Sequence, residues 1–206
     1  MAAIQITPLI SDFMKTLRDE YGFDTLAVRR IVLDAIRASD QRNPALLDVG
    51  AGSGWMAIMA AQSGYEVVSI DPDEEGLIRA KNRARQVLKS DAGRIRFLHA
   101  DASQMPFDDN GFDVVLSFDV VHHFADCVCP AAMDEMIRVC KPGGELLIAD
   151  LNGNGMNAVR SVHELAGLTH EENRCGVRDI DEILRDAGLD VTRRETRFVT
   201  LFHAFK

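Results

Sequence analysis

Three aspartates follow short apolar stretches at similar points in the chain. Asp48 opens the sequence DVGAGSG, Asp71 follows EVVSI, and Asp101 follows FLHA. Each carboxylate can accept hydrogen bonds and attract a positive charge, and the glycines after Asp48 allow a tight turn with close approach of the backbone to a ligand. One such aspartate is explained equally well as a helix cap or a turn residue. Three of them after successive apolar stretches indicate a binding site.

The spacing of these aspartates indicates a ligand that contains a nucleoside. Asp71 lies 21 residues after Gly50, the position from which a carboxylate accepts hydrogen bonds from both ribose hydroxyls. Asp101, which is followed by Ala102, can accept a hydrogen bond from an adenine amino group. The glycine-rich turn directs the N-terminal amides of the following helix toward the ligand.

Two nucleoside cofactors compete for this arrangement. Gly52–Ala57 matches the dinucleotide pattern G-x-G-x-x-A, which favours NAD. Asp48, however, lies at the mouth of the turn, where NAD would place an anionic pyrophosphate. At about 5–6 Å and an effective dielectric constant near ~20, the repulsion is on the order of 3 kcal/mol. S-adenosylmethionine (SAM) carries a positive sulfonium and ammonium group, which a carboxylate attracts. We therefore favour SAM and keep a nicotinamide-dependent oxidoreductase as the alternative.

Alternating strand-like and helical segments predict the fold that positions these side chains. Their pitch predicts an α/β fold, a doubly wound sheet of about seven strands with helices on both faces. The sheet is expected to be mostly parallel, with an antiparallel C-terminal strand, because no helix separates the last two strands. Ligands bind at the carboxyl ends of the strands in such sheets, where the three aspartates lie. The predicted strands are Ala45–Val49, Glu66–Ile70, Ile95–His99, Phe112–Phe118, Glu145–Asp150, Leu189–Arg194 and Phe198–Phe205. The predicted helices are Gly54–Gln62, Asp73–Lys89, Ala131–Cys140 and Val177–Ala187, with a turn at Lys141–Gly144.

The order of these segments predicts one domain over residues 1–206. The apolar spacing over Ser11–Ser39 is helical, with a break at Gly22. The insertion after the fifth strand is expected to start with a loop at Asn152–Asn157 and to carry His163, Glu164, His170 and Glu171 on an exposed helix and loop. The expected parts are an N-terminal helical cap (1–43), a SAM-binding core (44–150), a lid insertion (151–176) and a C-terminal helix and strand pair (177–206).

The charge balance argues against a nucleic-acid partner. The 206 residues include 32 acidic and 23 basic side chains, and the net charge of −9 does not attract phosphate backbones. The basic run Arg79–Arg85 is typical of a solvated helix face. The N-terminus lacks the basic segment of a signal peptide, no apolar run is long enough to span a membrane, and the four irregularly spaced cysteines are typical of reduced thiols. These features predict a cytoplasmic protein.

Four motifs in order resemble those of a known family. DVGAGSG, SIDPD, HADASQMPFDDNGFDVV and VCKPGGELLIAD are similar to the motif series of the class I SAM-dependent methyltransferases. The middle of the chain is especially similar to the methyltransferase type 11 group, which includes quinone-biosynthesis C-methyltransferases. The resemblance is strong over Ala45–Leu151 and implies a Rossmann-like fold and SAM as the cofactor, with S-adenosylhomocysteine as the product.

The resemblance also implies cofactor contacts at nine positions. These are Gly50, Ala51 and Gly52 along the methionine and ribose, Asp48 and the Phe118 carbonyl at the ammonium group, Asp71 at the ribose, and Pro72, Asp101 and Ala102 at the adenine. Trp55 departs from the pattern, because a smaller residue is expected after the last glycine. Its indole can pack on the cofactor, on the acceptor or on its own helix.

Methyl transfer needs few dedicated side chains, because the leaving group is already activated and positioning can supply much of the catalysis. A base is needed only when the acceptor must lose a proton, and the candidates are Asp119, His122 and His123 in the segment SFDVVHHF. That segment lacks the Asn/Asp-Pro-Pro-aromatic motif shared by enzymes that methylate exocyclic amines of bases or glutamine amides. The short lid favours a small-molecule acceptor, and a non-catalytic SAM-binding protein is the third hypothesis. No metal site is expected, since Cys127 and Cys129 match no standard zinc spacing with the histidine pair.

Overall fold

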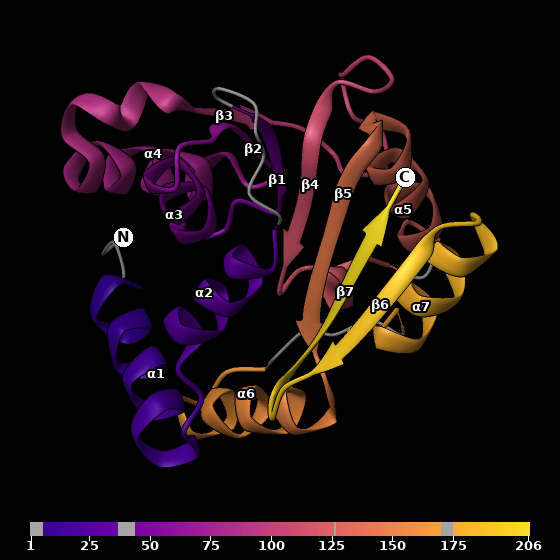
Figure 1. The fold of residues 1–206 in the computed structure, drawn as a ribbon. Coiled ribbons are helices and arrows are strands. Elements are labelled where there is room, and N and C mark those ends of the chain that lie inside the picture. The colour runs from indigo at the N-terminus through magenta and orange to yellow at the C-terminus, as the bar shows by residue number, and fades with distance from the viewer. Residues whose placement is uncertain (1–5, 37–43, 126, 170–174) are drawn as a thin grey trace.

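A seven-stranded sheet forms the centre of the molecule (Figure 1). The computed structural model describes residues 6–36, 44–125, 127–169 and 175–206. The strand order is β3-β2-β1-β4-β5-β7-β6, and among these strands β7 alone runs opposite to the others. The strands are β1 (Ala45–Val49), β2 (Glu66–Asp71), β3 (Ile95–His99), β4 (Phe112–Phe118), β5 (Cys140–Leu151), β6 (Asp190–Glu195) and β7 (Val199–Phe205). This confirms the predicted Rossmann-like sheet with one antiparallel strand near its end.

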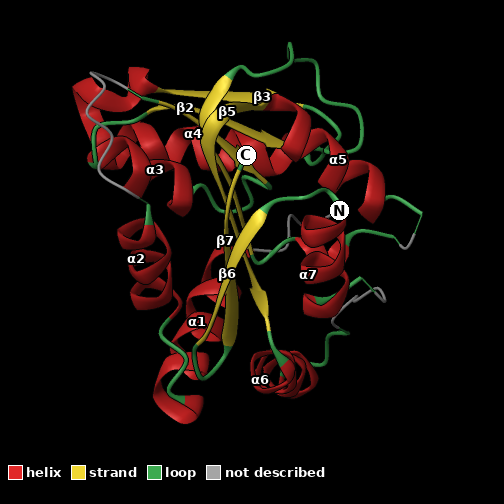
Figure 2. Cartoon of the chain, turned by 45° about the vertical axis from the view of Figure 1, so that its right-hand side comes forward, coloured by secondary structure: helices red, strands yellow, loops and turns green. Residues whose placement is uncertain are grey.

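Helices cover both faces of this sheet and the edge where the parallel strands end (Figures 1 and 2). α3 and α4 lie on one side and α5 and α7 on the other, while α1, α2 and α6 gather below the carboxyl ends of β4 and β5 in Figure 1. The helices are α1 (Ile6–Tyr21), α2 (Thr25–Ala35), α3 (Trp55–Gln62), α4 (Glu74–Leu88), α5 (Cys129–Val139), α6 (Gly153–Leu165) and α7 (Val177–Asp186), with 3-10 turns η1 (Lys89–Arg94) and η2 (Val121–His123). No helix in the described part of the chain is long and apolar enough to cross a membrane.

Successive residues of the central strands pack into two separate hydrophobic cores, one on each face of the sheet. Leu46 packs in the cluster that contains residues of α2, α3 and α6, whereas Leu47 packs in the cluster that contains residues of α5 and α7. Neither side chain is exposed. Burying each leucine stabilises the fold by about 1.5–3 kcal/mol, so a strand that is apolar at every position is favoured only between two helical layers. This is why the apolar runs of the sequence located the central strands well.

The predicted turn at Lys141–Gly144 was wrong, because these residues belong to β5. Cys140 pairs with Phe112 of β4, and the register shifts before Glu145 pairs with Val114. The backbone N–H of Gly143, which has a φ of +76°, donates to the Lys206 carbonyl. The glycines thus allow an irregular strand instead of a reversal of the chain.

The predicted loop at Asn152–Asn157 was also wrong, because α6 begins at Gly153. The side-chain oxygen of Asn152 accepts hydrogen bonds from the backbone N–H groups of Asn154 and Gly155, both at 3.1 Å, and so caps the helix. A Cβ on Gly155 would lie 2.0 Å from the carbonyl oxygen of Phe198. The glycine is therefore required for close packing rather than for a loop. Of the insertion residues named above, His170 and Glu171 lie outside the described residues.

The prediction that all four cysteines are reduced thiols was wrong for two of them. Cys129, the first residue of α5, forms a disulfide with Cys175, which precedes α7, and the two Cα atoms are 6.3 Å apart. Cys127 and Cys140 are free. The pair is 46 residues apart in the chain, and it meets because α5 and α7 pack together on one face of the sheet. Irregular spacing along the chain gave no sign of this contact.

Candidate functional site

The turn after β1 packs so closely that two of its positions require glycine. Gly50 has a φ of +88°, and a Cβ there would lie 2.3 Å from a methyl carbon of Val120. Gly54 has a φ of +81°, and a Cβ there would lie 2.9 Å from that of Ala80 in α4. Other residues rarely adopt this left-handed backbone. The turn thus packs between α4 and the segment after β4, and its remaining side borders the cavities described below.

Asp71, at the end of β2, fixes the shape of this turn. One carboxylate oxygen accepts the backbone N–H of Gly52 at 2.8 Å, and the other accepts that of Asp73 at 2.8 Å. Each carboxylate oxygen has a second acceptor site. Asp71 can therefore hold the turn and still accept hydrogen bonds from a pair of ligand hydroxyls.

Asp48 lies at the base of the turn and is almost fully buried. Only 1% of the residue is exposed, and the hydroxyl of Ser69 donates to Oδ2 at 2.7 Å. Burial raises the pKa of Asp48 to about 7, although the Ser69 hydrogen bond and the charge of Arg29 both lower it. From the sequence we expected Asp48 to be an anion. Near pH 7 this carboxyl is only partly ionised, so its charge discriminates less between cofactors than we expected.

Arg29 of α2 is the site residue that the sequence analysis missed. Its guanidinium carbon lies 4.8 Å from the centroid of the Phe118 ring, and its charge acts on Asp48 and Asp119. Burial lowers the pKa of Arg29. Its Nε and Nη1 atoms, Oδ1 of Asp48 and Oδ1 of Asp119 are buried without a hydrogen-bond partner in the described part of the molecule. A ligand that carries both an ammonium and a carboxylate group would satisfy these atoms.

Two cavities meet beside the turn. A cavity of about 220 Å³, here called the loop cavity, is bordered by Gly50–Ser53, Trp55, Phe118–Val120 and Arg29. A larger one of about 670 Å³, the outer cavity, is bordered by Asp71, Asp73 and Gly76 together with residues of α1 and α2. Gly52, Ser53 and Trp55 border both. Trp55 therefore lies where the loop cavity and the outer cavity meet. The guanidinium carbon of Arg83 lies 5.7 Å from the centroid of the Trp55 ring.

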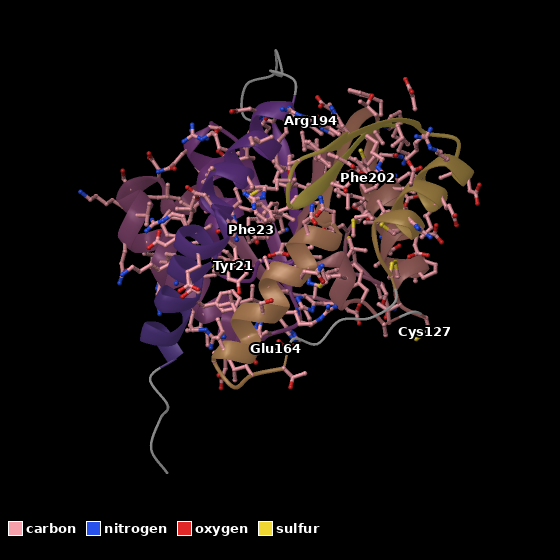
Figure 3. All side chains as sticks on the ribbon, turned by 90° about the horizontal axis from the view of Figure 1, so that it is seen from below. Tyr21, Phe23, Cys127, Glu164, Arg194 and Phe202 are labelled. Carbon is pink, nitrogen blue, oxygen red and sulfur yellow. A yellow bond between two sulfur atoms is a disulfide. The ribbon has the colours of Figure 1, made fainter. Side chains whose placement is uncertain are left out.

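A third cavity of about 250 Å³, the helix cavity, lies among α1, α2, α6 and η2. Figure 3 looks onto this edge from below and shows α1 and α6 side by side, with Phe23 near the middle and Cys127 at the rim. Arg29 and Asp119 border both this cavity and the loop cavity. Its walls are mainly apolar or aromatic and include three histidines. The apolar and aromatic residues are Phe13, Met14, Leu17, Phe23 and Val159, and the histidines are His122, His123 and His163.

His122, which borders the helix cavity, forms a buried pair with Asp150. The Nδ1 atom of His122 lies 2.5 Å from Oδ1 of Asp150, and the backbone N–H of His122 donates to Oδ2 at 2.8 Å. Asp119, with a φ of +62°, lies next to the pair. Burial raises the pKa of Asp119, and the nearby His122 lowers it. One ligand atom from each of Asp119, His122 and Asp150 lies within 4.8 Å of the others, a set that could hold a metal ion. The zinc site considered from the sequence involved only cysteines and histidines, so the two aspartates of this set were not expected.

Comparison with known proteins identifies the family. Residues 47–148 match the family model described as a methyltransferase domain. The chain is 37% identical over 122 residues to a demethylmenaquinone methyltransferase of Clavibacter sepedonicus, an alignment that covers 58% of this chain and 46% of that protein. It is 36% identical over 167 residues to the 27-O-demethylrifamycin SV methyltransferase of Amycolatopsis mediterranei, covering 75% of this chain and 56% of that one. Residues 47–148 therefore form a domain of the class I SAM-dependent methyltransferase type.

Solved structures show that this chain shares its fold with distant proteins. PH0226 from Pyrococcus horikoshii OT3 superposes with a TM-score of 0.70 at 18% identity, covering 91% of both chains. Phosphoethanolamine N-methyltransferase 2 of Haemonchus contortus in complex with SAM gives a TM-score of 0.68 at 18% identity, covering 94% of this chain and 60% of the other. Such low identity supports the fold alone. The chain spans about half the length of the curated relatives it matches.

The structure brings together one part of the predicted cofactor set. Asp48, Gly50, Ala51, Gly52, Asp71 and Phe118 meet around the turn. Asp101, Ala102 and Pro72 follow neighbouring strand ends but border neither the loop cavity nor the outer cavity. Oδ1 of Asp101 accepts the backbone N–H and the hydroxyl of Ser103 at 2.8 and 2.7 Å, which lowers its pKa. The predicted adenine contacts therefore stay predictions.

Proposed function

We propose that this chain transfers the methyl group of SAM to a small-molecule acceptor held in the helix cavity. The observation that carries the proposal is the pair of cavities that share Arg29 and Asp119. A cofactor beside the glycine turn and an acceptor between α1, α2 and α6 would meet at these two residues. A volume of about 250 Å³ suits a small molecule. The two relatives above are named for acting on demethylmenaquinone and demethylrifamycin, which are also small molecules.

The residues around the turn fit SAM. We assign the ribose to Asp71, whose oxygens keep free acceptor sites, and the ammonium group to Asp48, Asp119 and the Phe118 carbonyl. The guanidinium of Arg29 would pair with the carboxylate of the methionine part, because a buried cation without a hydrogen-bond partner is costly. The adenine would lie toward Pro72, Asp101 and Ala102. When bound, SAM supplies a methyl group on a positive sulfur.

In this proposal the protein orients the acceptor and excludes water from the reaction site. Leu17, Phe23 and Val159 bring apolar surface to the helix cavity, and each of them is at least nine-tenths buried. Such walls exclude water from the path between acceptor and methyl carbon and restrict the orientations of the acceptor. This follows the usual division of labour when the leaving group is already activated.

Calorimetry with S-adenosylhomocysteine tests the proposed function directly. We expect one binding site per chain, and no detectable binding would overturn the proposal. A release assay for S-adenosylhomocysteine, run with SAM and a panel of phenols, enols, amines and thiols, then tests turnover. Stoichiometric binding without turnover of any panel member would favour the non-catalytic SAM-binding hypothesis instead.

A further inference from the structure

We propose that His122, held by Asp150, takes the proton from an acceptor hydroxyl, and that the acceptor is a small phenol or enol. The inference rests on the proposed function and names the acceptor class and the proton acceptor for that reaction. Asp150 serves as a positioning residue in this scheme.

The hydrogen bonds around Asp150 define one state of the His122 ring. Oδ1 of Asp150 accepts from Nδ1 of His122 at 2.5 Å and from the backbone N–H of Leu151 at 2.7 Å, while Oδ2 accepts the backbone N–H of His122 at 2.8 Å. The same carboxylate thus holds both the backbone and the ring of His122. A neutral imidazole that donates through Nδ1 has its basic lone pair on Nε2.

The location of the ring puts this base at the acceptor space. His122 is only 2% exposed, yet it borders the helix cavity. Asp119, three residues earlier, has a left-handed backbone, and η2, which follows it, contacts β5. A buried histidine whose orientation is fixed by a buried carboxylate is the arrangement that general bases use.

The charges around the helix cavity favour an acidic hydroxyl over an amine. In our assignment the cofactor carboxylate pairs with Arg29 and the cofactor ammonium group with Asp119, which leaves the positive sulfur as the charge beside the acceptor. A positive sulfur repels an ammonium group and stabilises an oxyanion. The other titratable groups that border this cavity are Asp119, His123 and His163, and Asp150 lies behind them against His122. A phenol, with a pKa near ~10, is also within reach of an imidazole base with a pKa near ~6.5, and the aromatic walls suit a planar ring.

The proposed step balances as a proton transfer and a displacement. The acceptor O–H bond breaks and its proton goes to Nε2 of His122. The acceptor oxygen forms a bond to the methyl carbon of SAM while the sulfur–methyl bond breaks, and that electron pair stays on sulfur. Nε2 later returns the proton to solvent, which restores the neutral imidazole.

A metal ion at Asp119, His122 and Asp150 is the competing explanation for the cluster. Both oxygens of Asp150 already accept N–H groups, which suits an ion-free carboxylate. The positive charge of Arg29 also acts on Asp119 and disfavours a cation beside it. These contacts favour the base, and the experiment below includes the metal as an outcome.

The test uses 4-nitrophenol as a probe, because its phenolate is yellow and its phenol is colourless. The full chain is loaded with S-adenosylhomocysteine, so no turnover occurs, and probe occupancy is measured by calorimetry. Below the pKa of the free probe, we expect the bound probe to be yellow, because His122 has taken its proton. At equal occupancy, His122→Gln is expected to reduce the bound phenolate about tenfold, the effect of a shift of about one pKa unit. Asp150→Asn is expected to reduce it severalfold by releasing the ring.

His203→Gln is the matched control, because His203 pairs with Glu145 at 2.7 Å outside the helix cavity. It should keep the full yellow signal. The inference is overturned if wild type stays colourless at confirmed occupancy, if the probe does not bind, or if His123→Gln removes the signal and His122→Gln does not. A yellow signal that EDTA abolishes and Mg²⁺ restores would also overturn it and assign the cluster to a metal.

Two further measurements keep the outcomes separate. Unfolding curves establish which variants are folded, and His122→Asn serves as a second variant if His122→Gln is not. Binding of S-adenosylhomocysteine is measured for each protein before the probe is added. Failure of that binding in wild type overturns the proposed function, whereas normal binding without a yellow probe overturns only the role of His122 and the acceptor class.

Discussion

Oδ2 of Asp71 lies 2.8 Å from the amide nitrogen of Gly52, so the end of β2 holds the glycine-rich turn that follows β1. The two strands are parallel neighbours, and Val49 pairs with Ile70 just before the contact. The acidic residue that we assign to the ribose is therefore also part of the turn that surrounds the methionine. A change at Asp71 should act on both parts of the cofactor site.

Replacing Asp71 by alanine or asparagine should weaken S-adenosylhomocysteine binding at least about tenfold. A hydrogen bond to a charged group contributes about 1.5–3 kcal/mol, and about 1.4 kcal/mol corresponds to tenfold in affinity. Calorimetry checks this. Glu75→Gln, which removes a carboxylate from the exposed face of α4, is the control and should bind as wild type does. Unchanged affinity in both Asp71 variants would remove the ribose assignment.

Replacing Arg29 by methionine should also weaken S-adenosylhomocysteine binding about tenfold or more, because the cofactor carboxylate loses its cation. Lysine should give an intermediate affinity, since it keeps the charge but not the planar group. Trp55 is the single tryptophan of the sequence and borders two of the cavities, so its fluorescence can follow the titration. Arg30→Met, an exposed neighbour on α2, is the matched control. Equal affinities for the Arg29 and Arg30 variants would contradict the assignment.

The burial of Asp48 predicts a pH dependence of stability with a defined sign. Its pKa is raised from 3.8 to about 7, so the folded state disfavours ionisation and loses stability as the pH rises through this range. Relative to Asp48→Asn, which cannot ionise, the free energy of unfolding of wild type should fall by up to about 4 kcal/mol between about pH 4 and pH 7. Urea unfolding of the ligand-free proteins measures this difference. Parallel curves for the two proteins would show that Asp48 ionises normally.

Alanine at Gly50 should destabilise the fold more than alanine at Gly64. Both glycines have a positive φ, but nothing lies within 4 Å of a Cβ at Gly64, whereas Val120 blocks a Cβ at Gly50. We expect the difference in unfolding free energy to be about 1–3 kcal/mol, the usual cost of overpacking. Adding Val120→Ala should recover most of that difference and leave the cost of the left-handed backbone. Equal effects at the two glycines would contradict the close packing of the turn.

Much of the sheet could be predicted because the signal is local. The apolar runs gave β1, β3 and β4 with the bounds that the structure has. β1 and β4 are mostly buried between two helical layers, whereas β3 lies at the edge of the sheet and is only partly buried. β5 was predicted too short, because the glycines before Glu145 usually indicate a turn and only pairing with Phe112 makes them a strand. The loop predicted at Asn152–Asn157 was wrong for a similar reason. Asparagine and glycine are common in loops, but here Asn152 caps α6 and Gly155 allows close packing.

The residues of the candidate site that follow strands could be predicted from the sequence. The residue on α2 and the long-range contact between two side chains could not. Asp48 and Asp71 were found because strand ends in this fold meet at one edge, and Phe118 was implied by the family resemblance. Arg29 was missed, because on its own helix it looks like any solvated arginine. The contact between His122 and Asp150 joins residues 28 positions apart on β5 and η2, and only the parallel pairing of β4 and β5 brings them together.

The place of β7 in the sheet has a consequence for how the molecule folds. Among the described strands, β6 borders only β7, which lies between it and β5. β6 and β7 are joined by a short turn around Thr196, whereas β5 and β7 are separated by α6 and α7. The hairpin can form early from local contacts, but it gains its place only when β7 docks on β5, a long-range pairing that is slow to close. The last step in building the sheet is therefore expected to be the insertion of a preformed hairpin.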